Sequence, residues 1–346
     1  MRLSKLTAIG ISALALAIAA CSAEQAPGTL TLIAHDSFAD GVTEDTFAAF
    51  TEETGIRVEV LAAGDAGSMV NQAVLSKGNP LADVLFGVDD TYLSRALDEE
   101  IFRVYRSTEV DKVHPELVDT QYRVTPIDYG DVCINYDTAW FESTSIAVPE
   151  RLESLRAELY ASHLSVEHPA TSSPGLAFMF ATIAEFGEEG WLDFWADLRD
   201  GGVRVASDWT TAYYTDFLTH GGPSSMVVSY ASSPPAEVVF SEEPIDSPPT
   251  GVIEAGCYRQ VEYAGILAGT QYPAAAGKLI DFMLSLEFQE QIPLSWFVFP
   301  ANQDAQLPSV FAEHVVIPDD PARLSPAYIA ENRDRWIDEW IQVMEG

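Results

Sequence analysis

The feature that most constrains the fold is an alternation of extended and helical patterns in residues 29–89. Five segments follow one another in the order strand, helix, strand, helix, strand, at 29–34, 43–54, 57–61, 68–76 and 82–87. This order is typical of a parallel sheet, because parallel neighbours need a crossover connection that is long enough to hold a helix. The sequence therefore predicts an α/β fold that begins with a parallel sheet.

Acidic turns follow the three predicted strands of this unit. They are His35-Asp36-Ser37, Gly64-Asp65 and Asp89-Asp90. Open α/β sheets bind ligands at the carboxyl ends of their strands, so we expect these turns to meet at one edge and form part of a binding site. The candidate residues are Asp36, Ser37, Asp65 and Asp89. Aspartate is also common in turns for structural reasons alone, and that alternative stays open for each of them.

A second α/β pattern follows the first. Strand patterns occupy residues 132–136, 164–166, 203–206 and 226–230, and helical patterns occupy 151–159, 176–186, 191–198 and 209–218. Residues 258–267 are predicted to cross back to the first unit as a strand, before a helix at 273–288 and an amphipathic helix at 325–344. Two units joined by more than one crossover leave a cleft that a hinge can close.

The second unit adds two kinds of candidate binding residue. The turn Thr171-Ser172-Ser173-Pro174-Gly175 opens a helix, and its hydroxyl and N–H groups suit an anion such as phosphate, although every helix start needs such caps. Aromatic residues at predicted element ends suit a flat organic cation, with core packing as the alternative. These are Trp209, Tyr213, Tyr230, Trp296 and Phe297.

A candidate export signal precedes the α/β body. Arg2 and Lys5 stand before an apolar run at 6–20, which has the length of a signal-peptide hydrophobic region. The run ends in Ile18-Ala19-Ala20-Cys21, which resembles a bacterial lipobox. We predict a signal peptide over 1–20, a lipid on Cys21 and a polar tether over 21–28, with an unlipidated Cys21 as the alternative. The mature protein would then be anchored by its lipid to the outer face of the cytoplasmic membrane.

Export would place the two remaining cysteines, Cys133 and Cys257, in an oxidising compartment. Disulfides form and persist in such compartments, and we therefore favour a bridge between these two residues. Two buried free thiols are the alternative.

The charge of the chain excludes one class of partner. Lys and Arg number 18 against 53 Asp and Glu, for a formal net charge of -35. Nucleic acid is a poor partner for such a chain, because phosphate binding depends on cationic side chains that displace counterions. The histidines show no HExxH or Cys/His zinc spacing, and no Walker or GxGxxG loop occurs. We therefore predict neither a metal nor a cofactor.

Several short motifs recur in the order in which one known family has them. They are His35-Asp36-Ser37-Phe38, residues 82–89, Ile127-Asp128-Tyr129-Gly130, residues 171–176, Val228-Ser229-Tyr230, residues 258–262 and Ile292-Pro293 before an aromatic run. Across essentially the whole chain after the tether, the sequence resembles the thiamine-binding proteins of bacterial ABC importers.

The resemblance implies a two-lobed type II periplasmic-binding-protein fold, with a hinge and an interlobe cleft that holds thiamine or its phosphates. Residues 29–126 and 262–300 would form lobe 1, and residues 127–261 and 325–346 would form lobe 2. The protein would be a monomer that delivers its ligand to ABC permease subunits, and no bond would be broken.

The family also implies roles for individual residues. Asp36 and Asp65 would lie near the aminopyrimidine and thiazolium, and Ser172, Trp209 and Tyr230 near the hydroxyethyl or phosphate end, with Tyr213 close by. Either Trp296 or Phe297 would stack on the ligand. The sequence departs from the family at three positions, His35 and Ala236, where relatives can have Tyr, and Val42, where they can have Trp.

Two other functions remain open on sequence alone. A thiamine-degrading enzyme shares the fold and uses a cysteine nucleophile, for which Cys133 would be the candidate. Related two-lobed proteins bind ferric ion through neighbouring tyrosines, and Tyr213 and Tyr214 are adjacent.

Overall fold

The computed structural model describes residues 27–346. The predicted signal peptide, the lipid on Cys21 and most of the tether lie outside the described residues. Within residues 27–346, no helix combines the length and the apolar character that crossing a bilayer requires.

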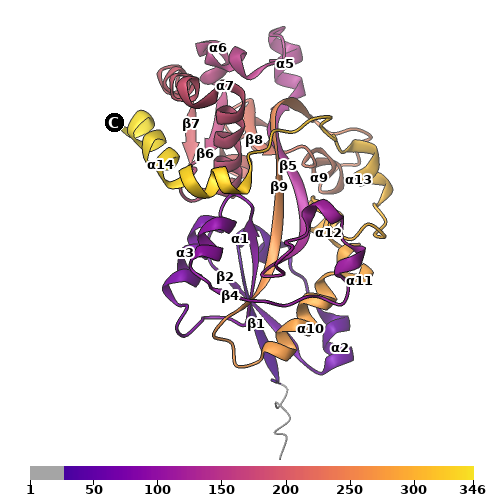
Figure 1. The fold of residues 1–346 in the computed structure, drawn as a ribbon. Coiled ribbons are helices and arrows are strands. Elements are labelled where there is room, and N and C mark those ends of the chain that lie inside the picture. The colour runs from indigo at the N-terminus through magenta and orange to yellow at the C-terminus, as the bar shows by residue number, and fades with distance from the viewer. Residues whose placement is uncertain (1–26) are drawn as a thin grey trace, which may run out of the picture.

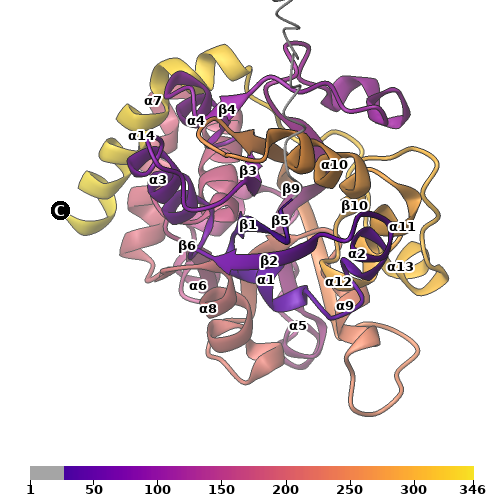
Figure 2. The ribbon, with the colours of Figure 1, turned by 90° about the horizontal axis from the view of Figure 1, so that it is seen from below.

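The first strands form the predicted parallel sheet. Strand β1 (Thr29–Ala34) lies between β2 (Arg57–Ala62) and β3 (Val84–Asp89) and pairs in parallel with both. Helix α3 (Ala66–Leu75) provides the crossover from β2 to β3. In the view from below, α3 lies to one side of these strands and α10 (Pro273–Met283) to the other (Figure 2). The alternation in the sequence is thus confirmed as a βαβ arrangement.

Two long antiparallel strands, β5 (Thr125–Asp137) and β9 (Thr250–Leu267), run through both lobes (Figure 1). The last part of β9 pairs with β3 in lobe 1, and β5 pairs with β8 (Met226–Tyr230) in lobe 2. The sheet order is β2-β1-β3-β9-β5-β8-β6-β7, where β6 is Leu164–Glu167 and β7 is Arg204–Ala206. The short strands β4 (Phe102–Arg103) and β10 (Phe299–Pro300) pair with β9 and β5.

The remaining helices cover these strands. Those of the first part of the chain are α1 (Asp36–Gly41), α2 (Ala48–Thr54) and α4 (Leu93–Asp98). Those of the second part are α5 (Thr138–Thr144), α6 (Glu158–Ala161), α7 (Ser173–Asp200), α8 (Trp209–Thr211) and α9 (Pro234–Val239). The last part adds α11 (Leu286–Gln289), α12 (Ile292–Ser295), α13 (Ser309–His314) and α14 (Pro326–Glu345).

The helix boundaries differ from the predicted ones at several places. Asp36 and Ser37, expected in a turn, open α1, and the next helix begins at Ala48 rather than Thr43. The helix predicted at 151–159 is a 3₁₀ segment, Leu152–Arg156, followed by α6, and the helix predicted at 273–288 is divided into α10 and α11. The helices predicted at 176–186 and 191–198 belong to one element, α7, which is interrupted at Gly187 by a φ of 66°. The helix predicted at 209–218 is only one turn of α8, followed by a π-helical segment, Ala212–Asp216.

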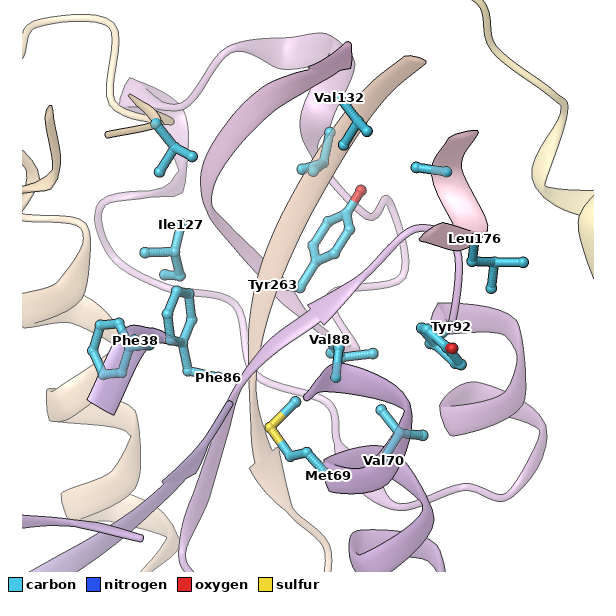
Figure 3. Packing of buried hydrophobic residues seen from close by; sticks show 14 of the residues in the cluster. Phe38, Met69, Val70, Phe86, Val88, Tyr92, Ile127, Val132, Leu176 and Tyr263 are labelled. Atoms are coloured by element: carbon cyan, nitrogen blue, oxygen red, sulfur yellow. The ribbon is translucent and has the colours of Figure 1, made fainter. Parts of the chain in front are cut away.

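A continuous hydrophobic core lies between the strands and the helices that cover them. In lobe 1, the rings of Phe38 and Phe86 meet edge to face with centroids 4.6 Å apart (Figure 3). In lobe 2, the amphipathic character predicted for the terminal helix is confirmed, because Trp336 and Trp340 of α14 are buried while Asp338 is exposed. Trp336 contacts Phe180 of α7 at 5.7 Å between centroids.

A disulfide joins Cys133 of β5 to Cys257 of β9. This is the pairing that the sequence led us to favour. It ties together the two strands that pass through both lobes.

Candidate functional site

A cavity of about 250 Å³ lies between the carboxyl ends of strands β1, β2 and β3 and the residues of the second lobe that face them. His35 and Asp65 line it from the first lobe, and Ser173, Trp209 and Tyr230 line it from the second. The cavity is therefore at the strand ends, where the acidic turns were expected to meet.

Seven of the predicted site residues line this cavity, and three do not. The seven are Ser37, Asp65, Trp209, Tyr213, Tyr230, Trp296 and Phe297. Asp36 lines a smaller adjoining pocket, and its Oδ1 accepts a hydrogen bond from the Gly64 N–H at 2.8 Å. Asp36 is thus engaged in holding the turn before α3.

Asp89 and Ser172 are both buried behind the cavity wall. Asp89 accepts hydrogen bonds from the N–H of Thr91, at 2.7 Å, and from the hydroxyl of Ser173. These contacts join the end of β3 to the first turn of α7. Asp89 therefore holds the first turn of α7 against the end of β3 and does not itself line the cavity.

Asp65 caps α3 and presents a carboxylate oxygen without a partner. Its Oδ1 accepts from the N–H of Ala66 at 2.8 Å, which satisfies one orphan donor of the helix start. Its Oδ2 is buried and has no hydrogen-bond partner among the described residues. Burial raises the pKa of Asp65, against the opposing effect of the Ser172 hydroxyl and the Ala66 N–H. Such an oxygen is available to a donor or a cation in the cavity.

Aromatic rings form the second-lobe wall of the cavity. Trp209 and Tyr213 stack nearly in parallel, with centroids 5.1 Å apart. Their polar atoms are held in place, because Trp209 Nε1 donates to Ser229 Oγ at 3.0 Å and the Tyr213 hydroxyl donates to Glu237 at 2.6 Å. Tyr230 is fixed in the same way by its hydroxyl, which donates to Gln260 Oε1 at 2.7 Å. The rings are thus rigid platforms rather than mobile side chains.

Trp296 and Phe297 differ in how their rings are engaged. Trp296 stacks with Phe38 at 4.7 Å and with Phe288 at 5.7 Å between centroids, and its Nε1 donates to the Phe38 carbonyl at 3.0 Å. Phe297 has a φ of 54° and meets Phe240 edge-on at 5.4 Å. Trp296 is therefore packed into the first lobe, whereas the backbone of Phe297 is held in the left-handed region at the cavity mouth.

Four ionisable groups of the cavity wall, His35, Asp40, Asp128 and Glu262, were not among the predicted binding residues, although His35 stands in the first acidic turn. His35 Nε2 lies 3.2 Å from Glu262 Oε1, and Asp128 stands opposite Glu262 in the β5–β9 register. Asp128 and Glu262 were both present in the family motifs. Their role was not visible, because the sequence does not show which residues of two distant strands face each other.

Asp128 and Glu262 have pKa values shifted in opposite directions. Burial, and then the neighbouring Glu262, raise the pKa of Asp128 well above its ordinary value. Burial also opposes the ionisation of Glu262, but the charge and hydrogen bond of His35 and a hydrogen bond from Asp128 outweigh it and lower the Glu262 pKa. Of this pair, Asp128 is therefore the group that keeps its proton to higher pH.

The charge balance of the cavity favours a cation. Its described lining includes Asp40, Asp65, Asp128 and Glu262 against one histidine, His35, and neither lysine nor arginine. Carboxylates combined with aromatic faces stabilise a flat organic cation through charge and cation–π attraction. The site as built suits such a ligand and offers no bidentate clamp for an anion.

The alternative of a ferric site has less support from the geometry. The Tyr213 hydroxyl is engaged with Glu237, and Tyr214 is 48% exposed. Within the described residues, no three or more His, Cys, Asp or Glu side chains gather in a way that could hold a metal ion.

Comparisons with known proteins find similar chains among bacterial solute-binding proteins. The family model described as bacterial extracellular solute-binding protein matches residues 79–317. The thiamine-binding periplasmic protein of Salmonella typhimurium is 28% identical over 318 residues, 91% of this chain and 93% of the relative. That of Brucella suis is 28% identical over 346 residues, 99% of this chain and 98% of the relative.

Solved structures of binding proteins superpose on most of this chain. A structure described as a periplasmic thiamin binding protein superposes with a TM-score of 0.79 at 26% identity, covering 91% of this chain and 96% of that one. A ferric binding protein from Campylobacter jejuni superposes with a TM-score of 0.71 at 18% identity, covering 91% of this chain and 99% of that one. At that identity, the second likeness concerns the two-lobed fold alone.

Proposed function

This chain belongs to the bacterial extracellular solute-binding proteins, and we propose that it captures thiamine in the cavity between its lobes for delivery to an ABC importer. The observation that carries the proposal is a cavity of about 250 Å³ lined by fixed aromatic rings and carboxylates, with no lysine or arginine in its described lining. The names of the thiamine-binding relatives, which match more than nine-tenths of this chain, support the same ligand.

The chemistry of thiamine complements these residues. Its thiazolium is permanently charged, and its aminopyrimidine has donor and acceptor edges, so stacking and a carboxylate recognise it without any proton transfer to the ligand. Asp65 Oδ2, buried and unpartnered, is the acceptor that we assign to the ligand, with Trp209, Tyr213 and Tyr230 as the ring contacts. We assign the stacking position at the cavity mouth to Phe297, since Trp296 is already stacked between other rings.

The hydroxyethyl or phosphate end of the ligand would approach the start of α7. Ser173 and Pro174 of its first turn line the cavity, while Ser172 is buried beneath them. Free N–H groups at a helix start attract an anion, so this end can accept a phosphate where one is present.

Several features of transport belong to the same proposal. The lobes, at 29–126 with 262–300 and at 127–261 with 325–346, would close over the ligand about a hinge. The protein would work as a monomer, anchored by a lipid on Cys21, and would present its ligand to the permease subunits. The family places the protein outside the cytoplasm, where the Cys133–Cys257 bridge is stable.

Enzymatic use of Cys133 has no support in this structure. A cysteine nucleophile acts as a thiolate, and Cys133 is bonded to Cys257. We therefore propose a binding protein that breaks no bond in its ligand.

Calorimetric titration with thiamine, thiamine monophosphate, thiamine diphosphate and a plain pyrimidine tests the proposal. We expect thiamine to bind and the uncharged pyrimidine to bind much more weakly, because it lacks the charge that the carboxylates complement. Equal binding of both would show that the acidic wall is not used. A visible tyrosinate band on adding ferric ion, without binding of thiamine, would favour the iron-binding alternative.

A further inference from the structure

His35 occupies a position in the cavity wall where its ring cannot move freely. It follows β1 directly and caps α1, and its ring lies against the backbone of Gly87 in β3. A Cβ added at Gly87 would lie 2.2 Å from His35 Cδ2, and the Gly87 φ is 96°. The rings of Phe38 and Phe86 lie 6.4 and 6.1 Å from the imidazole. The imidazole is thus fixed with one edge toward Glu262.

The hydrogen-bond partners of His35 differ between its two protonation states. Nε2 lies 3.2 Å from Glu262 Oε1 and can donate to it in either state. Nδ1 lies 3.2 Å from the Phe38 N–H and also 3.2 Å from Ser37 Oγ. Neutral Nδ1 accepts from the Phe38 N–H, whereas protonated Nδ1 donates to Ser37 Oγ and gives up the Phe38 bond, so protonation changes the partner of Nδ1 while the ring stays in place.

The charged groups around His35 are all acidic. Glu262 faces it from β9, Asp65 from the start of α3, Asp89 from the end of β3, and Asp128 stands behind Glu262 on β5. Among the residues described as lining the cavity, His35 is the one side chain that can carry a positive charge at neutral pH. An arriving cation therefore competes with protonated His35 for the same carboxylates.

We propose that His35 carries a proton on Nδ1 in the empty cavity and loses it to the solvent when a cationic ligand binds, so that capture of thiamine releases a proton. This inference rests on the proposed function. The covalent change is limited to one N–H bond of the imidazole, whose proton passes to the buffer.

The electrostatics around His35 agree with this assignment. Burial alone would lower the pKa of His35, but Glu262 first, and then Asp65 and Asp89, outweigh it and raise the pKa above its ordinary value. A permanent positive charge beside the ring acts in the opposite direction and lowers the pKa. Because binding then releases a proton, the affinity for thiamine rises with pH between the His35 pKa of the loaded protein and that of the free protein. Each unit of difference between these two pKa values corresponds to about a tenfold change in affinity.

Calorimetry of the wild-type protein in two buffers with different ionisation enthalpies measures the number of protons released. We expect proton release near neutral pH and a thiamine affinity that rises with pH there. His35→Gln keeps a nitrogen donor near Glu262 but cannot titrate. It should abolish both the release and the pH dependence, and bind more tightly than wild type at acidic pH.

The matched control is His114→Gln. His114 also stands beside a glutamate, with Nδ1 3.9 Å from Glu116 Oε1, but it does not line the cavity. This variant should release protons like wild type. Asp128 is the other possible source of the released proton, and Asp128→Asn tests it. If Asp128→Asn no longer releases a proton while His35→Gln still does, the proton comes from Asp128 and the proposal is overturned.

NMR titration of the His35 ring, assigned by its absence in His35→Gln, gives a second measurement, made on the wild-type protein. We expect an elevated pKa in the free protein and a lower one with thiamine bound. Thiamine binding without proton release, or with an unchanged His35 pKa, would overturn this inference and leave the proposed function standing. Failure of the wild-type protein to bind thiamine would overturn both.

Discussion

The hydroxyl of Tyr92 donates a hydrogen bond to the carbonyl oxygen of Pro169, 2.8 Å away, and thereby joins the segment after β3 to the loop before α7. A second backbone bond, from the Gly67 N–H to the Thr171 carbonyl at 3.0 Å, reinforces the same junction. The guanidinium of Arg333 in α14 lies over the Tyr92 ring at 4.5 Å. The two lobes are thus held together at a defined point next to the cavity.

Removal of this junction should weaken ligand binding. Tyr92→Phe keeps the ring but leaves the Pro169 carbonyl without its donor, which weakens this junction between the lobes by about 1–2 kcal/mol. We expect thiamine to bind about 5- to 30-fold more weakly, with a larger radius of gyration for the loaded protein in small-angle scattering. An unchanged affinity with a lower Tm would show instead that the bond serves only folding stability.

The two central binding assignments can be tested together. Asp65→Asn and Trp209→Ala should each weaken thiamine binding by roughly 1–3 kcal/mol, the scale for a buried charge-assisted bond or a stacked ring. Calorimetry measures the effect. Asp338→Asn and Tyr272→Ala, at exposed positions outside the cavity, are the matched controls and should bind as wild type. Wild-type affinity in both site variants would refute the assignment.

Gly87→Ala should be more harmful than an ordinary glycine substitution. The new Cβ would clash with the His35 ring, in addition to the cost of about 1–2 kcal/mol for a side chain at positive φ. Gly55→Ala is the matched control, because Gly55 has a φ of 72° but nothing within 4 Å of an added Cβ. The difference in the free energy of unfolding between the two variants should be about 1–3 kcal/mol. Equal losses would show that the His35 ring moves aside easily.

Stability should fall as the pH rises from about 5 to about 8. Burial, followed by the charge of Asp89, raises the pKa of Asp90 to about 8, and burial raises the pKa of Asp89 to about 6. Because these folded-state values exceed the unfolded ones, the native protein binds more protons, and its advantage is lost as the pH rises through them.

Asp90→Asn identifies the group responsible. The amide oxygen can still accept from the Val261 N–H, which lies 3.1 Å from Asp90 Oδ1, but it cannot ionise. We expect a higher Tm than wild type at about pH 8 and a flatter dependence of Tm on pH. Asp338→Asn should leave the slope unchanged. A slope that survives in Asp90→Asn would mean that other buried acids dominate.

The sequence predicted the parts of the fold that depend on local pattern. The strands at 29–34, 57–61 and 82–87 alternate with helices, and that alternation sufficed for the parallel sheet. The full extent of β9 was not visible, because its first half, from Thr250 to Cys257, includes Glu254 and two glycines and lacks a clear strand pattern. Its pairing with β5 is long-range and depends on the tertiary structure.

The sequence predicted cavity-lining residues correctly where an acidic or aromatic residue stood at the end of a predicted strand or helix. Trp209 and Asp65 met both conditions, and both line the cavity. Asp89 met them too, but the hydroxyl of Ser173 covers it, which depends on how α7 packs against β3. Glu262 was missed for the opposite reason, since it lies within a strand and gains its importance from His35 across the sheet.

The passage of β5 and β9 through both lobes also determines when the protein can fold during synthesis. The strands β1, β2 and β3 are complete once the ribosome has passed residue 89, but their sheet lacks its neighbour until residues 262–266 emerge. Neither lobe can therefore mature while the chain is still growing through the other, and an amino-terminal fragment that ends before residue 262 would expose the bare edge of β3. Both lobes are therefore completed by residues that come late in the chain.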